Sequence, residues 1–498
     1  MVDRREFLGF AGAFAAVGAT GAAKGLKDGL GPERLRFGAL SDIHITTPRQ
    51  QPYFEQALRR LDAWKVDGVL ACGDLADYGL EQQLQLVADT WFKVFPGGKG
   101  GDGRPVANLM HYGDHDMAVA YVDRPDAVAQ WPDAAARKAG LIFTGDRKAI
   151  WERCFHEEWQ PIAFKVVKGY EFVLSHFTRG EPGNEHGNNV PGLRDFLAGH
   201  RFDPKKPFFY SQHRVPKNTA GGPEIWGQED GQTTELFSSY PNLIAFCGHC
   251  HMSSAYEKSI WQGAFTCVQV PSLRYCTSPG GRENSYAIHD RHQYCPTLPV
   301  KAMGEMSSGS THLGYLCMVH DNACVIRRWE FKEDCAMGPD WVIPFESFDL
   351  PAARKPFAFA NRAAAEVAPE FPEGATVTVS RKKDVDALRQ PHDMVVVSFP
   401  AAPAADGRLR AHDYEVSLRV RQGDVERTLL QKRVFSPRYL FGAERETEPV
   451  VCQFTEKEVP TDFPIRLVVR PVGTFGAAGR AVETGLIEIT AKGIKELT

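Results

Sequence analysis

Residues 35–44 read LRFGALSDIH, in which an apolar run from Leu35 to Leu40 leads into Asp42 and His44. A short apolar run of this kind predicts a buried strand. The same arrangement recurs four times. Apolar runs at 66–72, 106–110, 207–210 and 243–247 lead into Gly73-Asp74, Gly113-Asp114-His115-Asp116, His213 and Gly248-His249-Cys250-His251. Carboxylates and imidazoles are ligands that Fe, Mn and Zn share, so side chains converging from these strand ends would form a metal site.

Taken in order, the five motifs resemble the calcineurin-like metallophosphoesterase superfamily, whose signature is D-x-H, G-D, G-N-H-(D/E), H and G-H-x-H. The resemblance spans roughly Leu35 to Pro344, and four motifs match as they stand. The second motif has the longer G-D-x-x-D form, which ends at Asp77. The third departs from the signature, because Asp114 occupies the position of the family's Asn. This carboxylate adds a potential negative charge and leaves the metal preference open.

The resemblance implies a binuclear centre of two divalent or trivalent ions, with Fe, Mn and Zn as candidates. One ion would be held by Asp42, His44, Asp74 and His251, and the other by Asp74, Asp114, His213 and His249. Asp74 would then bridge the two ions. Two cations about 3.5–4 Å apart polarise a phosphoryl group and deliver a bridging hydroxide as the nucleophile.

The resemblance also implies roles for residues beside the ligands. His115 would protonate the leaving group or stabilise the phosphoryl oxygens, and Asp116 would orient its imidazole. Asp77 would hold a ligand or the loop through hydrogen bonds. Candidates for substrate contact are His176, Arg179, Arg214 and Arg274. For His176, as for His111 and His186, the competing interpretation is a hydrogen-bonded structural histidine, and Cys250 is interpreted as a packing residue.

The amino terminus, MVDRREFL, carries paired arginines before a Gly- and Ala-rich, mildly apolar stretch from Gly9 to about Ala23. This pattern is typical of a twin-arginine export signal. The stretch is too short and too weakly apolar for a membrane span, so we expect cleavage and no transmembrane span afterwards. The predicted location is periplasmic or extracellular, and export of a folded chain would allow metal loading in the cytoplasm.

Composition narrows the partners of the chain. The net charge of −4 and the lack of a Lys/Arg-rich block give no indication of a nucleic-acid groove. The partner that the resemblance implies is a small phosphate ester. The 11 cysteines leave disulfides open, with pairs among Cys267, Cys276 and Cys295 or among Cys317, Cys324 and Cys335 as candidates.

At 498 residues the chain is too long for one core. We predict a signal and linker over residues 1–30, an α/β metallophosphoesterase domain over 33–348, and a C-terminal domain over 355–498. The resemblance implies that the catalytic domain is a two-sheet sandwich flanked by helices (αββα). Strands expected at 265–271, 315–319 and 324–331 would close its second sheet. Seven short β runs after Pro351 predict a fibronectin-III-like or immunoglobulin-like sandwich. The short linker after Phe348 favours a sandwich that supports the catalytic pocket.

The sequence thus predicts an exported metallophosphoesterase. The block from Gly73 to Gly79 most resembles the phosphodiesterase branch of the superfamily, so diester hydrolysis is favoured. A phosphomonoesterase with the same site is one alternative. The other is a non-catalytic exported protein that uses the metals structurally and binds or adheres through its sandwich. His115 argues against the second alternative, because a scaffold needs no histidine between two metal-loop carboxylates.

Overall fold

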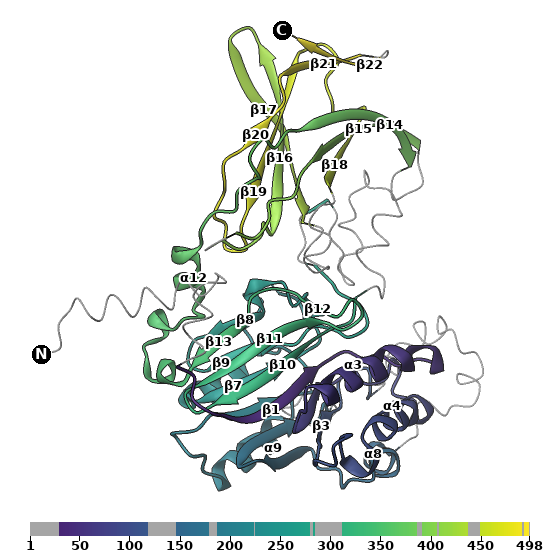
Figure 1. Cartoon of the computed structure of the whole chain (residues 1–498), viewed down its shortest axis with the longest axis vertical. Helices are drawn as coiled ribbons and strands as arrows, with labels where there is room; N and C mark the ends of the chain where they lie inside the picture. The colour runs from purple at the N-terminus through teal and green to yellow at the C-terminus, as the bar shows by residue number, and fades with distance from the viewer. Residues whose placement is uncertain are drawn as a thin grey trace, which may run out of the picture.

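The structure is a computed structural model that describes residues 29–117, 146–178, 187–223, 225–278, 282–283, 311–385, 391–405, 408–436, 449–490 and 493–497. The predicted export signal, His186 and Arg179 lie outside these residues. No helix in the described ranges is long and apolar enough to cross a membrane. The catalytic half and the C-terminal half form separate sets of sheets, drawn in the lower and upper parts of Figure 1.

The catalytic half contains two sheets. The first has the order β12-β11-β10-β1-β2-β3, with β13 paired to β11, and the second has the order β4-β5-β6-β7-β9-β8. The strands of the first sheet are β1 (Glu33–Leu40), β2 (Gly68–Cys72), β3 (Ala107–His111), β10 (Leu313–His320), β11 (Ala323–Glu330), β12 (Cys335–Ala336) and β13 (Trp341–Pro344). Those of the second are β4 (Ile162–Val167), β5 (Tyr170–Ser175), β6 (Phe208–Ser211), β7 (Leu243–Cys247), β8 (Ile260–Gln262) and β9 (Thr266–Gln269).

The two sheets pack face to face through aromatic side chains. Phe37 on β1 meets Phe172, Phe209 and Phe246 of the second sheet edge-on, with ring centroids 5.3, 5.1 and 5.7 Å apart. Edge-to-face contacts add to the apolar area that these rings remove from water. This shared core fixes one sheet against the other, and with it the strand ends that carry the predicted ligands.

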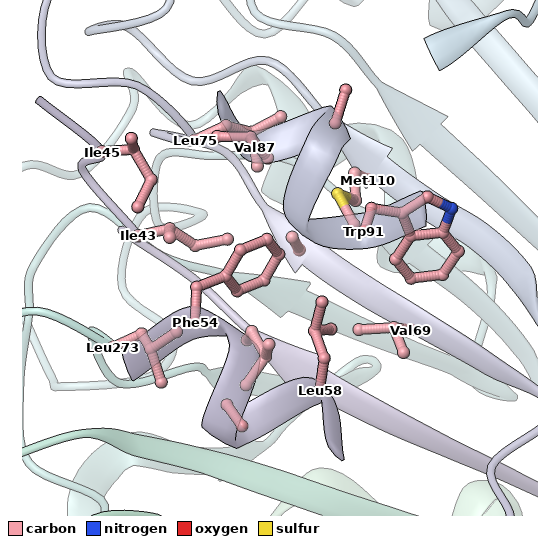
Figure 2. Close-up of a cluster of buried hydrophobic side chains, with 14 of the residues drawn as sticks. Ile43, Ile45, Phe54, Leu58, Val69, Leu75, Val87, Trp91, Met110 and Leu273 are labelled. Carbon is pink, nitrogen blue, oxygen red and sulfur yellow. The ribbon is translucent and has the colours of Figure 1, made fainter. Parts of the chain in front are cut away.

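Helices cover the outer faces of both sheets. They are α3 (Gln51–Ala63), α4 (Glu81–Val94), α8 (Arg147–Phe155), α9 (Val190–Gly199) and α10 (Gln232–Leu236). On α4, Leu84, Val87, Ala88 and Trp91 follow the i, i+3, i+4, i+7 spacing of a buried helix face. Figure 2 shows Val87 and Trp91 of α4 in one cluster with Phe54 and Leu58 of α3 and Val69 of β2. The predicted αββα architecture is therefore present.

Two of the three strands that were expected to close the second sheet lie in the first sheet instead. Of the three, only β9 joins the second sheet, whereas β10 pairs antiparallel with β1, and β11 pairs with β10. The sheet that carries the first three motifs therefore receives the later strands. The apolar alternation of these strands suits either sheet, so periodicity alone could not assign them.

The C-terminal half is all β. One sheet has the order β14-β15-β18 and the other β17-β16-β19-β21-β22, with β20 paired to β19. Its strands are β14 (Thr378–Val385), β15 (Pro391–Phe399), β16 (Asp413–Gln422), β17 (Val425–Phe435), β18 (Val450–Thr455), β19 (Ile465–Val472), β20 (Val482–Glu483), β21 (Leu486–Thr490) and β22 (Gly493–Leu497). Side chains of both sheets, including Val397, Phe454, Val416 and Leu467, share one core. The short helix α12 (Phe359–Ala365) precedes this β-sandwich.

Candidate metal centre

The predicted ligands all follow strands. Asp42 and His44 follow β1, Asp74 follows β2 and Asp114 follows β3. In the second sheet, His213 follows β6, and His249 and His251 follow β7. Strands β1, β2 and β3 run parallel, as do β6 and β7, so each set delivers its ligands to one sheet edge. Packing of the two sheets brings the two edges together.

Two groups of possible ligand atoms contain Asp74, each with all of its atoms within 4.8 Å of one another, and a third, smaller group consists of His44, Asp77 and His115. The first contains Asp42, His44, Asp74 and His251, and the second contains Asp74, Asp114, His213 and His249. Asp74 belongs to both groups. These residues therefore fit a dinuclear metal centre, and the division between the two ions is the one that the resemblance implies.

The backbone at the ligands is strained. Asp42, His44, Asp74, His249 and His251 have positive φ values of 50°, 50°, 52°, 71° and 53°. Non-glycine residues seldom occupy this left-handed region, and such strain persists where the surrounding structure imposes it, often at functional sites. The turns after β1, β2 and β7 thus adopt costly conformations that direct their ligands inward.

In the first group, the hydrogen bonds of the imidazoles favour cation binding. Nδ1 of His44 lies 3.1 Å from Oδ1 of Asp77, and Nδ1 of His251 lies 3.1 Å from the carbonyl oxygen of Tyr275. When both Nδ1–H groups donate to these oxygens, each neutral ring keeps a lone pair on Nε2. The two Nε2 atoms are 3.3 Å apart. Facing lone pairs repel, and a cation between them removes that repulsion.

In the second group, His213 likewise has Nδ1 near a carbonyl oxygen and Nε2 toward the other ligands. Nδ1 of His213 lies 2.7 Å from the carbonyl oxygen of Cys72. Its Nε2 is 3.1 Å from Oδ2 of Asp74 and 3.2 Å from Oδ1 of Asp114, and the latter oxygen is buried without a hydrogen-bond partner among the described residues. Against the effect of desolvation, the Asp74 and Asp114 carboxylates raise the pKa of His213 well above its usual value. A cation at Nε2 would replace that proton.

Position 73 requires glycine because the backbone there lies close to a predicted ligand and to the loop of the third motif. Its φ is +86°, and a Cβ there would lie 2.6 Å from both Nδ1 of His213 and Cα of Gly113. A side chain would therefore displace a predicted ligand or the loop of the third motif. This explains why the motif places glycine directly before Asp74.

Asp77 and His115 lie beside the ligands and are linked to each other. Nδ1–H of His115 donates to the carbonyl oxygen of Asp77 over 2.7 Å, while the Asp77 carboxylate accepts from His44 and from Thr46. Desolvation opposes a charge on His115, but the carboxylates of Asp74, Asp114 and Asp77 raise its pKa to about 9. The His115 side chain is 28 % exposed, so a substrate can reach it.

The expected pairing of Asp116 with His115 is wrong. The Asp116 carboxylate is buried and accepts the backbone N–H groups of Leu75, Ala76 and Gly113 over 3.0, 2.7 and 2.8 Å. It thereby ties the loop of the second motif to that of the third. Burial and the neighbouring Asp74 raise the pKa of Asp116 to about 7, although the three amides oppose this shift. The residue that orients His115 is Asp77.

The substrate-contact candidates differ in their surroundings. His176 is buried among aromatic rings and accepts the Tyr112 N–H over 3.1 Å, which is the structural role considered as the alternative. Arg274 donates to the His44 carbonyl oxygen over 2.9 Å and pairs with Asp77 over 3.2 Å. Arg214 lies 3.5 Å from Asp114 and packs on the Phe177 ring. Arg274 and Arg214 therefore border the site, whereas His176 does not.

No cysteine of the described residues belongs to a group of possible metal ligands. The Cys250 thiol points away from the imidazoles and donates to the Trp226 carbonyl oxygen over 2.8 Å. No disulfide joins two cysteines of the described ranges, so the candidate pair Cys267 and Cys276 and those among Cys317, Cys324 and Cys335 are not formed. Cys295 lies outside those ranges.

Apart from Arg274, the sequence did not indicate the segment Ser272–Ser278, which contacts ligands that follow strands of both sheets. The Ser272 hydroxyl donates to the Asp42 carbonyl oxygen over 3.0 Å. The Tyr275 ring packs on that of His251, with centroids 4.2 Å apart. These residues belong to no ligand motif, and their role depends on backbone carbonyls, which leave no sequence signal.

Comparisons with known proteins give one matching family model and several similar solved structures. Residues 35–253 match the family model described as calcineurin-like phosphoesterase. No curated protein sequence matches the chain. Among solved structures, a dimetal phosphatase from Danio rerio is similar at 9 % identity and a TM-score of 0.35, covering 63 % of this chain and 100 % of its own. A purple acid phosphatase from yellow lupin (Lupinus luteus) seeds is similar at 12 % identity and a TM-score of 0.38, covering 64 % and 56 %.

Proposed function

We propose that this chain, whose residues 35–253 match the calcineurin-like phosphoesterase family model, hydrolyses phosphate diesters at the two ligand groups that share Asp74. Two bound ions would polarise the phosphoryl group and lower the pKa of a shared water. The protein holds the seven ligands on two packed sheets, and Asp77 orients His115 toward its role as proton donor. The shared Asp74 is the observation that carries the proposal.

The charge of the site supports the preference for diesters. A phosphate monoester carries close to two negative charges near neutral pH, whereas a diester carries one. Asp114 places a further carboxylate among the ligands, and Arg274 is already engaged by Asp77 and by the His44 carbonyl oxygen. Both features make the site less favourable for a dianion. The sequence block from Gly73 to Gly79 points in the same direction.

Metal analysis of the purified protein, together with hydrolysis of bis(nitrophenyl) phosphate and nitrophenyl phosphate, tests this function. We expect about two ions per chain and a higher kcat/KM for the diester. A higher kcat/KM for the monoester would replace the proposal with the phosphomonoesterase. Two bound ions without hydrolysis of either ester would favour the non-catalytic binding protein.

The substitution Asp114→Asn should shift the substrate preference toward monoesters. It removes one negative charge near the phosphoryl site, and a unit charge at 5 Å contributes about 3 kcal/mol at an effective dielectric constant of about 20. Solvent and bound ions reduce this electrostatic energy. We therefore expect the monoester-to-diester ratio of kcat/KM to rise at least about tenfold. The metal ion that gives the highest activity should change as well, because an amide replaces a carboxylate.

A matched control is Asp321→Asn, which removes a carboxylate from the exposed pair with Arg34. Arg34 lies near the start of β1, at the opposite end of the strand from Asp42. Parallel kinetics with both esters and a series of divalent ions give the comparison. If Asp114→Asn keeps the wild-type substrate ratio and metal ranking, the charge of Asp114 does not set the preference.

Export through the twin-arginine pathway is part of the same proposal and is supported by the sequence of residues 1–23. Replacing Arg4 and Arg5 with lysine in a reporter fusion should leave the reporter in the cytoplasm, as measured by cell fractionation. Undiminished export of that double variant would instead indicate the general secretory route, in which the metals would bind after translocation.

A further inference from the structure

Among its contacts with the catalytic half, the C-terminal β-sandwich binds two consecutive residues, Arg282 and Glu283. Arg282 pairs with Asp413 of β16 over 2.7 Å, and Glu283 pairs with Lys432 of β17 over 3.3 Å. The backbone N–H of Glu283 also donates to the Arg433 carbonyl oxygen over 2.7 Å. We call Arg282 and Glu283 the anchor pair, because side chains and backbone both attach them to the sandwich.

These attachments are buried. The Asp413 side chain is fully buried between Arg282 and Arg433, and Lys432 is 4 % exposed and also pairs with Glu458 over 2.9 Å. An ion pair shielded from water in this way is costly to break by removing one partner, whereas exposed pairs contribute little. The anchor pair is therefore held firmly by the sandwich.

Four residues before the anchor pair, the chain reaches the metal centre. The segment Tyr275–Ser278, which we call the strap, supplies the carbonyl oxygen that accepts Nδ1–H of His251. The backbone N–H of Thr277 donates to the His251 carbonyl oxygen over 2.8 Å, and its hydroxyl donates to that of Cys250 over 2.5 Å. Only three residues separate Ser278 from Arg282, so their Cα atoms are at most about 14 Å apart.

Apolar contacts join the same elements. Phe435, at the end of β17, is fully buried in the cluster that contains Cys276 of the strap and Met252 beside the ligand loop. The Arg282 guanidinium lies 5.0 Å from the centre of the Phe435 ring. The sandwich thus supplies a core residue to the catalytic half next to the strap.

We propose that the β-sandwich is a structural part of the metal centre, which holds the strap through the anchor pair and so fixes the imidazole of His251 for one of the two ions. The inference rests on the two-ion site proposed above. Groups that accept the second N–H of a metal-binding histidine set the direction of its ligand nitrogen, and losing them lowers metal affinity by about 10–100-fold. Arg282 and Glu283 are positioning residues, since they act through the strap.

The test uses the full chain with Arg282→Ala and Glu283→Ala combined. The chain is titrated with Zn²⁺ or Mn²⁺ in a calorimeter. Compared with the wild type, the double variant should bind one ion with a dissociation constant about 10-fold higher or more, and the other with a change of less than about threefold. The conservative double variant, Arg282→Lys with Glu283→Asp, should recover most of that affinity. Asp413→Asn should produce the same selective loss from the sandwich side.

Arg466→Ala is the matched control. It removes exposed ion pairs with Glu426 and Glu483 inside the sandwich, away from the anchor pair. Unchanged affinity for both ions in the double alanine variant would overturn the proposal, and so would equal weakening of both ions, which indicates general destabilisation. Metal titration requires no substrate. A wild-type chain that binds two ions and hydrolyses no ester would contradict the proposed function while leaving this inference standing.

Discussion

The substitution Asp74→Ala should release at least one metal ion and lower phosphodiester hydrolysis by about four orders of magnitude or more. Asp74 is the side chain common to both ligand groups, and its Oδ2 lies 3.1 Å from Nε2 of His213 and 3.7 Å from Nε2 of His44. Its Oδ1 also accepts the backbone N–H of His115 over 2.9 Å. Alanine therefore removes the bridge and one support of the third motif together.

Metal content per chain and kcat measured on the same preparations test this expectation. The control is Asp67→Ala, because Asp67 is a buried carboxylate at the opposite end of β2 that accepts the Arg36 N–H. This control should lose stability but retain both ions. An Asp74→Ala protein that keeps two ions and wild-type activity would refute the two-ion assignment.

Much of the site could be predicted because its signal lies in side-chain chemistry at strand ends. Apolar runs before Asp42, Asp74 and His249 indicate where the strands stop, and parallel strands must deliver their ligands to one edge. The positive φ values at these three residues could not be predicted from the sequence. A glycine often indicates left-handed backbone, whereas an aspartate or a histidine does not.

Other parts of the site depend on contacts that sequence order conceals. Asp116 directly follows His115 and was expected to orient it, yet the Asp116 carboxylate accepts backbone amides of the second motif instead. A residue adjacent in sequence to a catalytic candidate often points elsewhere, because the turn between them decides its direction. Asp77 is 38 residues from His115 and reaches it through a backbone carbonyl.

Contacts between parts of the chain that are far apart in sequence were the hardest to predict. The placement of β10 beside β1 depends on which sheet edge is open, and both sheets present the same apolar pattern. The attachment of Arg282 to Asp413 joins positions 131 residues apart. Neither residue has a distinctive neighbourhood in the sequence, so only the folded chain shows that the sandwich contacts the segment beside His251.

The substitution His115→Asn should lower kcat for an alkyl phosphodiester by about 10²–10⁴ while both metal ions remain bound. His115 belongs to neither of the two groups that contain Asp74. Its Nδ1–H is engaged by the Asp77 carbonyl oxygen, so Nε2 is the nitrogen from which a proton would pass to the departing alkoxide. Asparagine retains a polar side chain but cannot supply that proton.

The dependence on the leaving group separates the possible roles of His115. Nitrophenolate needs little protonation, so the loss of kcat should be much smaller for bis(nitrophenyl) phosphate than for an alkyl diester. His200→Asn is a suitable control, because His200, which directly follows α9, is partly exposed and pairs with Glu171 of β5. Equal losses for both esters would assign His115 to stabilising the phosphoryl oxygens, and loss of a metal ion would make it a ligand. Proton donation predicts neither result, because its contribution scales with the basicity of the group that leaves.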